Sequence, residues 1–150
     1  MEKEWKVSLE FKANSFEPAL TQVLHMTIGG RGTGGGAVHG DRTPAIFTHS
    51  TNGFLVASSV GNDHNDVQWI QALPSFGEWI KIEITQEVEV TEMIYSITIG
   101  GKKLSSKRNS RPSRFENVKV FSSSSWDPAA SGFIKNLVIE NKKNGKEFNL

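Results

Sequence analysis

The chain has 150 residues, a formal net charge of +1 at pH 7 and no cysteine. Its hydrophobic fraction of 37% and charged fraction of 22% are typical of a soluble globular domain, and no apolar run approaches the roughly 20 residues of a membrane-spanning helix. The near-neutral charge lacks the basic field of most nucleic-acid-binding domains, and the absence of cysteine excludes disulfides, thiolate zinc sites and a cysteine nucleophile. We therefore expect a single domain over residues 1–150, with no membrane span and no nucleic-acid partner.

Strand-like alternation begins close to the start of the chain. Every second residue from Trp5 to Phe11 is apolar, which predicts a half-buried strand because successive side chains of a strand point to opposite faces. Gly100-Gly101 predicts the tight turn of a hairpin over residues 97–104, because glycine accepts the positive φ angles of a type I′ turn. Further strand-like segments, bounded by Gly, Pro, Asn or Ser, lie at residues 22–28, 45–49, 54–60, 79–85, 93–99, 115–121 and 133–140. No segment has helical periodicity, so the pattern predicts an all-β fold, an antiparallel two-sheet β-sandwich.

Two segments predict long surface loops, the glycine-rich residues 29–40 and the serine-rich residues 122–131. Strand-like sequence starts without a preceding signal peptide, which favours a domain excised from a longer chain.

Residues 78–86 with 95–101, residues 112–121, and the Gly-x-Ile-x-Asn-Leu pattern that starts at Gly132 resemble segments of concanavalin A-like domains, in particular laminin G-like domains. Residues 40–45 are also similar to a segment of such domains. The resemblance implies a jelly-roll sandwich that works as a non-catalytic recognition module for a glycan or an extracellular protein surface. It also implies an extracellular or cell-surface location and a role of the cell-adhesion type. The alternative is a structural or adhesion scaffold without a small ligand.

We expect a ligand to bind at the rim loops of the sandwich. An exposed indole can stack on the apolar face of a sugar ring, and Trp69 and Trp126 both lie among polar residues. Local packing is the alternative for Trp126, whereas Trp5 and Trp79 occupy strand positions and are predicted core residues. The candidate ligand-binding residues are Trp126, Asp127, Asn62, His64, Trp69, His39 and Arg42. Because one sugar contact is weak, useful avidity requires a homo-oligomer or repetition within a longer chain.

The segment from Asn62 to Asp66 concentrates oxygen ligands in what the sequence predicts to be a loop. Calcium takes six to eight oxygen ligands, so Asp41, Asp63 and Asp66 are candidate calcium ligands. The alternative is a plain turn, because Asn and Asp side chains bond their own backbone.

Residues 102–114 carry the strongest charge asymmetry of the chain. Their cations predict a second kind of site, for a sulfated glycan or another anion, and a solvated loop is the alternative. The candidate anion-binding residues are Lys102, Lys103, Lys107, Arg108, Arg111 and Arg114.

Residues 87–92 resemble the Glu-x-Asp-x-x-Glu signature of glucanases in the same superfamily, but Glu89 stands in the Asp position. A retaining glycosidase needs two carboxyl groups about 5 to 5.5 Å apart. The segment lies where the chain is expected to turn between two strands, so a solvated acidic turn explains it better. We therefore predict that the protein is not an enzyme.

Overall fold

The computed structural model describes residues 1–29, 38–61, 63–70, 75–123, 127–143 and 146–149, without the side chains of residues 63–65, 143 and 146–149. Within these residues every regular element is a strand. The strands are β1 (Glu4–Ala13), β2 (Thr21–Thr27), β3 (Ala45–His49), β4 (Gly53–Val60), β5 (Asp63–Ile70), β6 (Trp79–Glu89), β7 (Glu92–Ile99), β8 (Lys102–Arg108), β9 (Lys119–Phe121), β10 (Gly132–Lys143) and β11 (Lys146–Asn149). No helix in the described part of the chain is long and apolar enough to cross a membrane.

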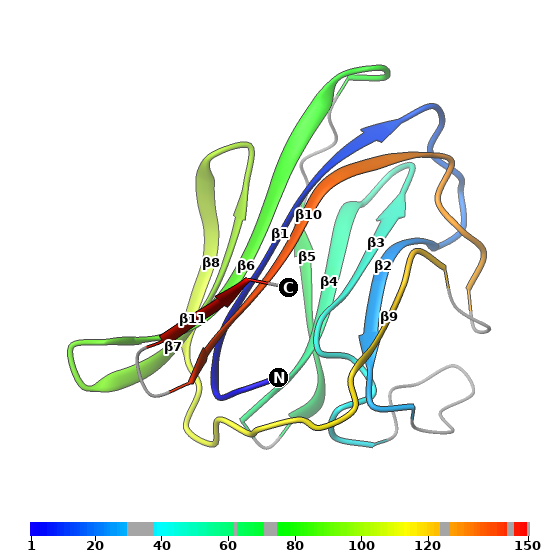
Figure 1. Ribbon diagram of the computed structural model, residues 1–150. Helices are drawn as coiled ribbons and strands as arrows, with labels where there is room; N and C mark the ends of the chain where they lie inside the picture. Colours follow the sequence, from blue (N-terminus) through cyan, green and yellow to red (C-terminus); the bar gives the residue numbers. More distant parts are fainter. Residues whose placement is uncertain (30–37, 62, 71–74, 124–126, 144–145, 150) are drawn as a thin grey trace.

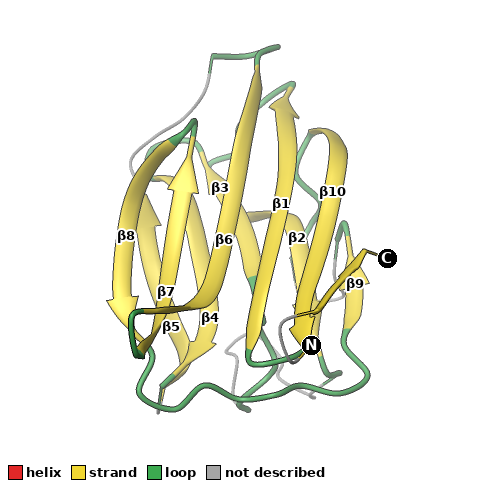
Figure 2. Ribbon diagram, turned by 60° about the vertical axis from the view of Figure 1, so that its left-hand side comes forward, coloured by secondary structure: helices red, strands yellow, loops and turns green. Residues whose placement is uncertain are grey.

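The strands form two sheets that face each other (Figure 1). A six-stranded sheet has the order β11-β10-β1-β6-β7-β8, a five-stranded sheet has the order β5-β4-β3-β2-β9, and all neighbouring strands are antiparallel. Figure 2 shows the long strands of the six-stranded sheet in front of the shorter ones of the other sheet. The predicted all-β antiparallel sandwich is thus confirmed.

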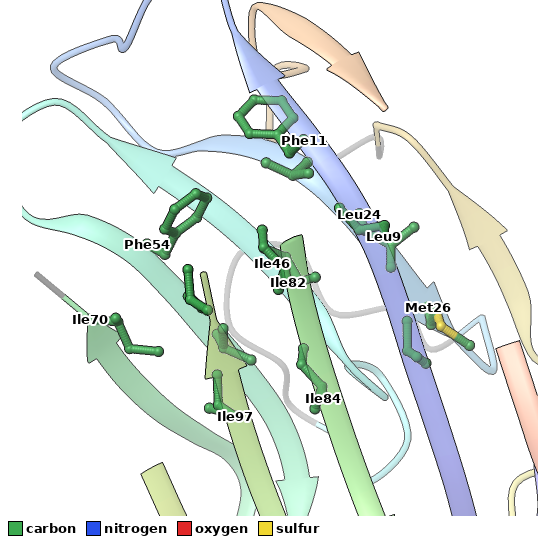
Figure 3. Packing of buried hydrophobic residues seen from close by; sticks show 14 of the residues in the cluster. Leu9, Phe11, Leu24, Met26, Ile46, Phe54, Ile70, Ile82, Ile84 and Ile97 are labelled. Atoms are coloured by element: carbon green, nitrogen blue, oxygen red, sulfur yellow. The ribbon is translucent and has the colours of Figure 1, made fainter. Parts of the chain in front are cut away.

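The core lies between the two sheets, and the alternation of inward and outward side chains along each strand determines which residues form it. The alternation predicts that every second side chain of β1 from Trp5 to Phe11 lies in the core, and all of these are buried. In β6, Ile82 and Ile84 face the same layer. Figure 3 shows buried side chains of both sheets meeting in this space. The Tyr95 side chain of β7 is also in this layer, and its hydroxyl lies 2.6 Å from the Ser58 hydroxyl of β4, so one hydrogen bond joins the two sheets through the core.

Three strands and one tryptophan differ from the sequence prediction. Of the predicted strand at residues 115–121, only β9 (Lys119–Phe121) is a strand. Residues 63–70 form β5, although the polar start of this segment predicts a loop, and β11 has no counterpart among the predicted strands. Trp79 is 39% exposed and is not a core residue, because Ile80, Ile82 and Ile84 take the inward positions of β6 and leave Trp79 on the outer face. There the Lys135 ammonium lies 4.2 Å from the Trp79 ring centroid, a cation–π contact.

The two edges of the sandwich are built differently. At the edge formed by β5 and β8, Lys107 makes an ion pair with Asp66, and the Ser105 hydroxyl donates to the Gln68 amide oxygen at 3.5 Å, so side chains bridge the sheets. At the opposite edge β9 has only three residues, and β11 pairs with β10 only from Glu140 onward. We call these the closed edge and the open edge.

Candidate functional site

The outer face of the five-stranded sheet carries one predicted ligand-binding residue, Trp69, in register with residues of the neighbouring strands. One row across the sheet consists of Trp69, Leu55, Phe47 and Gln22. The next row consists of Val67, Ala57, Ala45, His25 and Phe121. The middle of both rows is buried, because Phe47, Leu55, Ala45 and Ala57 form a second apolar cluster apart from the main core. A ligand on this face therefore meets its margins and not its centre.

One margin is a buried polar cluster around His25 and Arg42. The His25 Nε2 atom lies 2.7 Å from the carbonyl oxygen of Asp41, and burial lowers the pKa of His25 below its usual value. Arg42 is 9% exposed and its guanidinium lies 5.6 Å from the Phe47 ring. Burial lowers the pKa of Arg42, and the carboxylates of Asp127 and Asp41 oppose that shift. The structure thus brings two predicted ligand residues, Arg42 and Asp127, into one electrostatic cluster, in which Arg42 is too buried to meet a ligand at the surface.

The same margin contains buried polar atoms with no hydrogen-bond partner among the described residues. They are both side-chain polar atoms of Gln22 and the Oδ1 atom of Asp41. The other carboxylate oxygen of Asp41 accepts the backbone N–H of Val38 at 3.0 Å. Buried polar groups are nearly always hydrogen-bonded, so these atoms mark a polar interior on this side of the sheet.

The opposite margin is exposed and contains Trp69. This side chain is 47% exposed, and its ring lies perpendicular to the His49 ring, with centroids 6.1 Å apart. The two rings meet across β4 at Gly53, which pairs with His49 and has no side chain to separate them. The Thr51 hydroxyl lies 3.1 Å from His49 Nδ1 and donates to the Asn52 side-chain oxygen at 3.2 Å. We call Trp69, His49, Thr51 and Asn52 the Trp69 rim site.

Sequence reasoning identified Trp69 but not its neighbours in this site. Asn52-Gly53 is a hairpin signal that places polar residues in an exposed turn between two strands. Without β5 among the predicted strands, however, nothing in the sequence brings that turn next to Trp69.

The remaining predicted ligand residues do not join either margin within the described structure. His39 contacts the Phe115 ring, with centroids 5.2 Å apart, and its Nε2 atom lies 3.1 Å from the Ser113 hydroxyl. Trp126 and Asn62 lie outside the described residues, as does the side chain of His64. Their role in ligand binding stays a prediction.

The candidate calcium ligands are not assembled by the described side chains. Asp66 is engaged by Lys107 and by the Gln68 side-chain amide, which donates to it at 3.2 Å. Asp41 is fully buried, and the side chain of Asp63 lies outside the described part. No group of three or more His, Cys, Asp or Glu side chains that could hold a metal ion occurs among the described residues. As they stand, Asp41 and Asp66 do not fit a calcium ion.

The basic segment is largely neutralised by neighbouring carboxylates. Its ion pairs are Lys103 with Glu89, Lys107 with Asp66, Arg108 with Glu92, and Arg114 with Glu2 and Glu116. Lys107 is directed toward the other sheet at the closed edge, whereas the next residue, Arg108, pairs with the start of β7. The cations therefore do not form one open surface.

The acidic segment at residues 87–92 forms the end of the β6–β7 hairpin, where Glu89 pairs with Glu92 in register and Val90 has a φ of 60°. Each carboxylate pairs with a different cation: Glu87 with Lys142, Glu89 with Lys103, and Glu92 with Arg108. Hairpin ends of this kind are solvated, and the arrangement supports the interpretation as an acidic turn.

Comparison with protein-family models gives no match, and no curated protein matches the sequence. The solved structure of a native heptameric SAP-like pentraxin from Limulus polyphemus is similar to 92% of this chain, with a TM-score of 0.54 and 9% sequence identity. This chain spans 64% of the length of that pentraxin chain. The similarity shows the fold, a jelly-roll β-sandwich, and at this identity it shows nothing further.

Proposed function

We propose that this protein is a recognition module that binds a glycan at the Trp69 rim site. The observation that supports the proposal is an indole nearly half exposed at the end of a sheet row, next to a turn of polar side chains. A large aromatic side chain at such a position leaves apolar area in water that a ligand can cover.

The chemistry of the site matches a sugar ring. The indole offers a flat apolar surface for the C–H groups of one pyranose face, while the imidazole of His49, the hydroxyl of Thr51 and the amide of Asn52 offer donors and acceptors for sugar hydroxyls. None of these four side chains is a carboxylate, so the site holds its ligand without offering the paired acids of a glycosidase.

A site with one aromatic platform binds a single sugar weakly. A dissociation constant near 1 mM corresponds to about 4 kcal/mol, so biological use requires several copies of the site. The proposal therefore includes a domain that acts as part of a longer extracellular or cell-surface chain, or as a homo-oligomer.

A glycan array followed by titration of the hits tests the proposal. We expect Trp69→Ala to weaken glycan binding at least tenfold, and Asn52→Ala to weaken it by a smaller factor. Trp79→Ala is the matched control, because Trp79 is also a partly exposed tryptophan but lies on the outer face of the other sheet. Equal binding by Trp69→Ala and wild type, or a wild-type protein that binds no glycan on the array, would contradict the proposal. The second result would favour the alternative of a scaffold without a small ligand.

A further inference from the structure

The open edge of the sandwich contains a hollow of about 390 Å³ that the glycan site does not use. Its walls come from both sheets: Phe11 of β1, Val23 of β2, and Phe133 and Ile134 of β10, with Ala130 from the preceding connection. Phe11 and Val23 belong to the main core and are 2% and 1% exposed, so they form the floor of the hollow. Ligand pockets in proteins are typically of roughly this size or larger.

Small residues line one side of the hollow. Ala129, Ala130 and Gly132 line it, and a Cβ atom added at Gly132 would lie 2.3 Å from the Lys12 carbonyl oxygen. Glycine is therefore required at position 132 for close approach to β1, and no side chain from this position fills the space.

A second hollow, of about 290 Å³, lies along the same edge and is lined by Met26, Val120 and Ile139 among others. Val120 pairs with the inward-facing Met26 of β2, so its side chain faces the space between the sheets, yet it is 41% exposed. An inward-facing apolar residue that is exposed shows that this edge is unsealed over more than the first hollow.

From these features we propose that the larger hollow is a binding slot for one unbranched hydrocarbon chain. None of the described residues that line it is charged, and the polar ones among them are Gln22 and Ser122. A sugar would leave most of its hydroxyls unpaired against such walls, which is costly, whereas a hydrocarbon chain has no polar group to satisfy. Facing sheets are about 10 Å apart, and the core side chains occupy part of that space, so the slot suits a single chain in thickness.

The ligand class is a single-chain amphiphile whose hydrocarbon tail lies in the hollow, against Phe11 and Val23. Ser122 is exposed, so the polar end of the amphiphile stays at the surface there. This site is independent of the proposed glycan site, because the Trp69 rim site belongs to β5 and the slot lies beyond β2, at the other edge of the same sheet.

Titration of the wild-type protein with octanoate, decanoate and dodecanoate, each below its micelle concentration, tests the slot. Affinity should rise about fourfold for each added methylene until the slot is full, because each buried CH₂ contributes about 0.8 kcal/mol. Methyl NMR signals of Val23 and Ile134 should shift on binding, whereas that of Ile70, a core residue in β5, should not.

Ala130→Phe should fill the slot and weaken decanoate binding at least tenfold. Ala19→Phe is the matched control, because it adds the same side chain at an exposed loop position. Affinity that does not change with chain length, or shifts confined to residues outside the slot, would refute the proposal even if Ala130→Phe failed to fold. Binding only to phospholipid vesicles and not to the monomeric amphiphiles would also refute it. Trp69→Ala should retain decanoate binding, so failure of the glycan proposal leaves this test unaffected.

Discussion

The hydrogen bond between Tyr95 and Ser58 should behave as a coupled pair when either partner is removed. Both side chains are buried, each at 1% exposure, and their oxygens are 2.6 Å apart. Tyr95→Phe leaves the Ser58 hydroxyl buried without this partner, and Ser58→Ala does the same to the Tyr95 hydroxyl. An orphaned buried hydroxyl costs about 1–3 kcal/mol, so each single variant should lose about 2 kcal/mol of unfolding free energy.

The double variant should lose much less than the two single losses together, because it leaves no orphaned hydroxyl in the core. We expect it to lose only about 1 kcal/mol, the net contribution of the bond, which corresponds to a coupling energy of about 3 kcal/mol. Urea unfolding followed by tryptophan fluorescence measures all four proteins. Tyr95→Phe combined with Ser8→Ala is the control pair, because Ser8 lies on β1 and makes no hydrogen bond with Tyr95. Additive losses for Tyr95 and Ser58 would show that the bond does not join the sheets in solution.

Two further predictions concern acid stability and one glycine. Burial lowers the pKa of His25 in the folded protein below the ordinary 6.5. As the pH falls, the unfolded chain therefore takes up the proton first. The stability that neutral His25 supplies above about pH 6.5 should be lost as the pH falls below that value. Urea unfolding at about pH 7.5 and pH 5.5 should show a smaller loss for His25→Gln than for wild type, and equal losses would contradict the assignment. Gly132→Ala should destabilise the protein by more than 2 kcal/mol, at the upper end of single substitutions, because the new methyl group would overlap the Lys12 carbonyl and lie 2.8 Å from the Phe11 ring. Gly77→Ala, where a Cβ meets open space at a φ of 79°, should cost only about 1–2 kcal/mol, and a Gly132→Ala loss no larger than this would refute the close contact.

The sequence predicted the parts of the fold that depend on the core. Alternation from Trp5 to Phe11 gave β1 and its buried face, and Gly100-Gly101 gave the β7–β8 turn, in which both glycines have positive φ. It failed for β5, because the first residues of that strand are polar and the side chain of Asp66 is satisfied by Lys107 from the other sheet. A partner 41 positions away in the chain leaves no local signal.

The placement of Trp79 could have been predicted from the residues around it. Ile80, Ile82 and Ile84 define the buried face of β6, and the same alternation leaves Trp79 outside together with Lys81. A tryptophan in a strand suggested burial, but its position in the alternation decides which face it takes. On that face the Trp79 ring contacts the ammonium groups of Lys12 and Lys135 and not the core.

The candidate site could be predicted only at the level of residue type. Trp69 was identified because an indole among polar residues has no clear core position, and this holds in the structure, where it is 47% exposed. The contact with His49 depends on β4 lying between β3 and β5 and on the missing side chain of Gly53. The first is a property of the sheet order, which the strand pattern of one sequence does not determine, and Gly53 has its effect only within that order.

Among the exposed apolar residues of the described structure, Trp69 and Val120 lie on the two edge strands of the five-stranded sheet. Trp5 and Met26 are buried in the core. Trp69, in contrast, is 47% exposed, and Val120, which pairs with Met26 in register, is 41% exposed. A sandwich selected for stability alone would seal the open edge as Lys107 and Asp66 seal the closed one, or would replace the exposed apolar residues by polar ones. Exposed apolar surface that stability does not require is typical of binding sites. This is why we propose ligand binding at the rim at Trp69 and at the slot of the open edge.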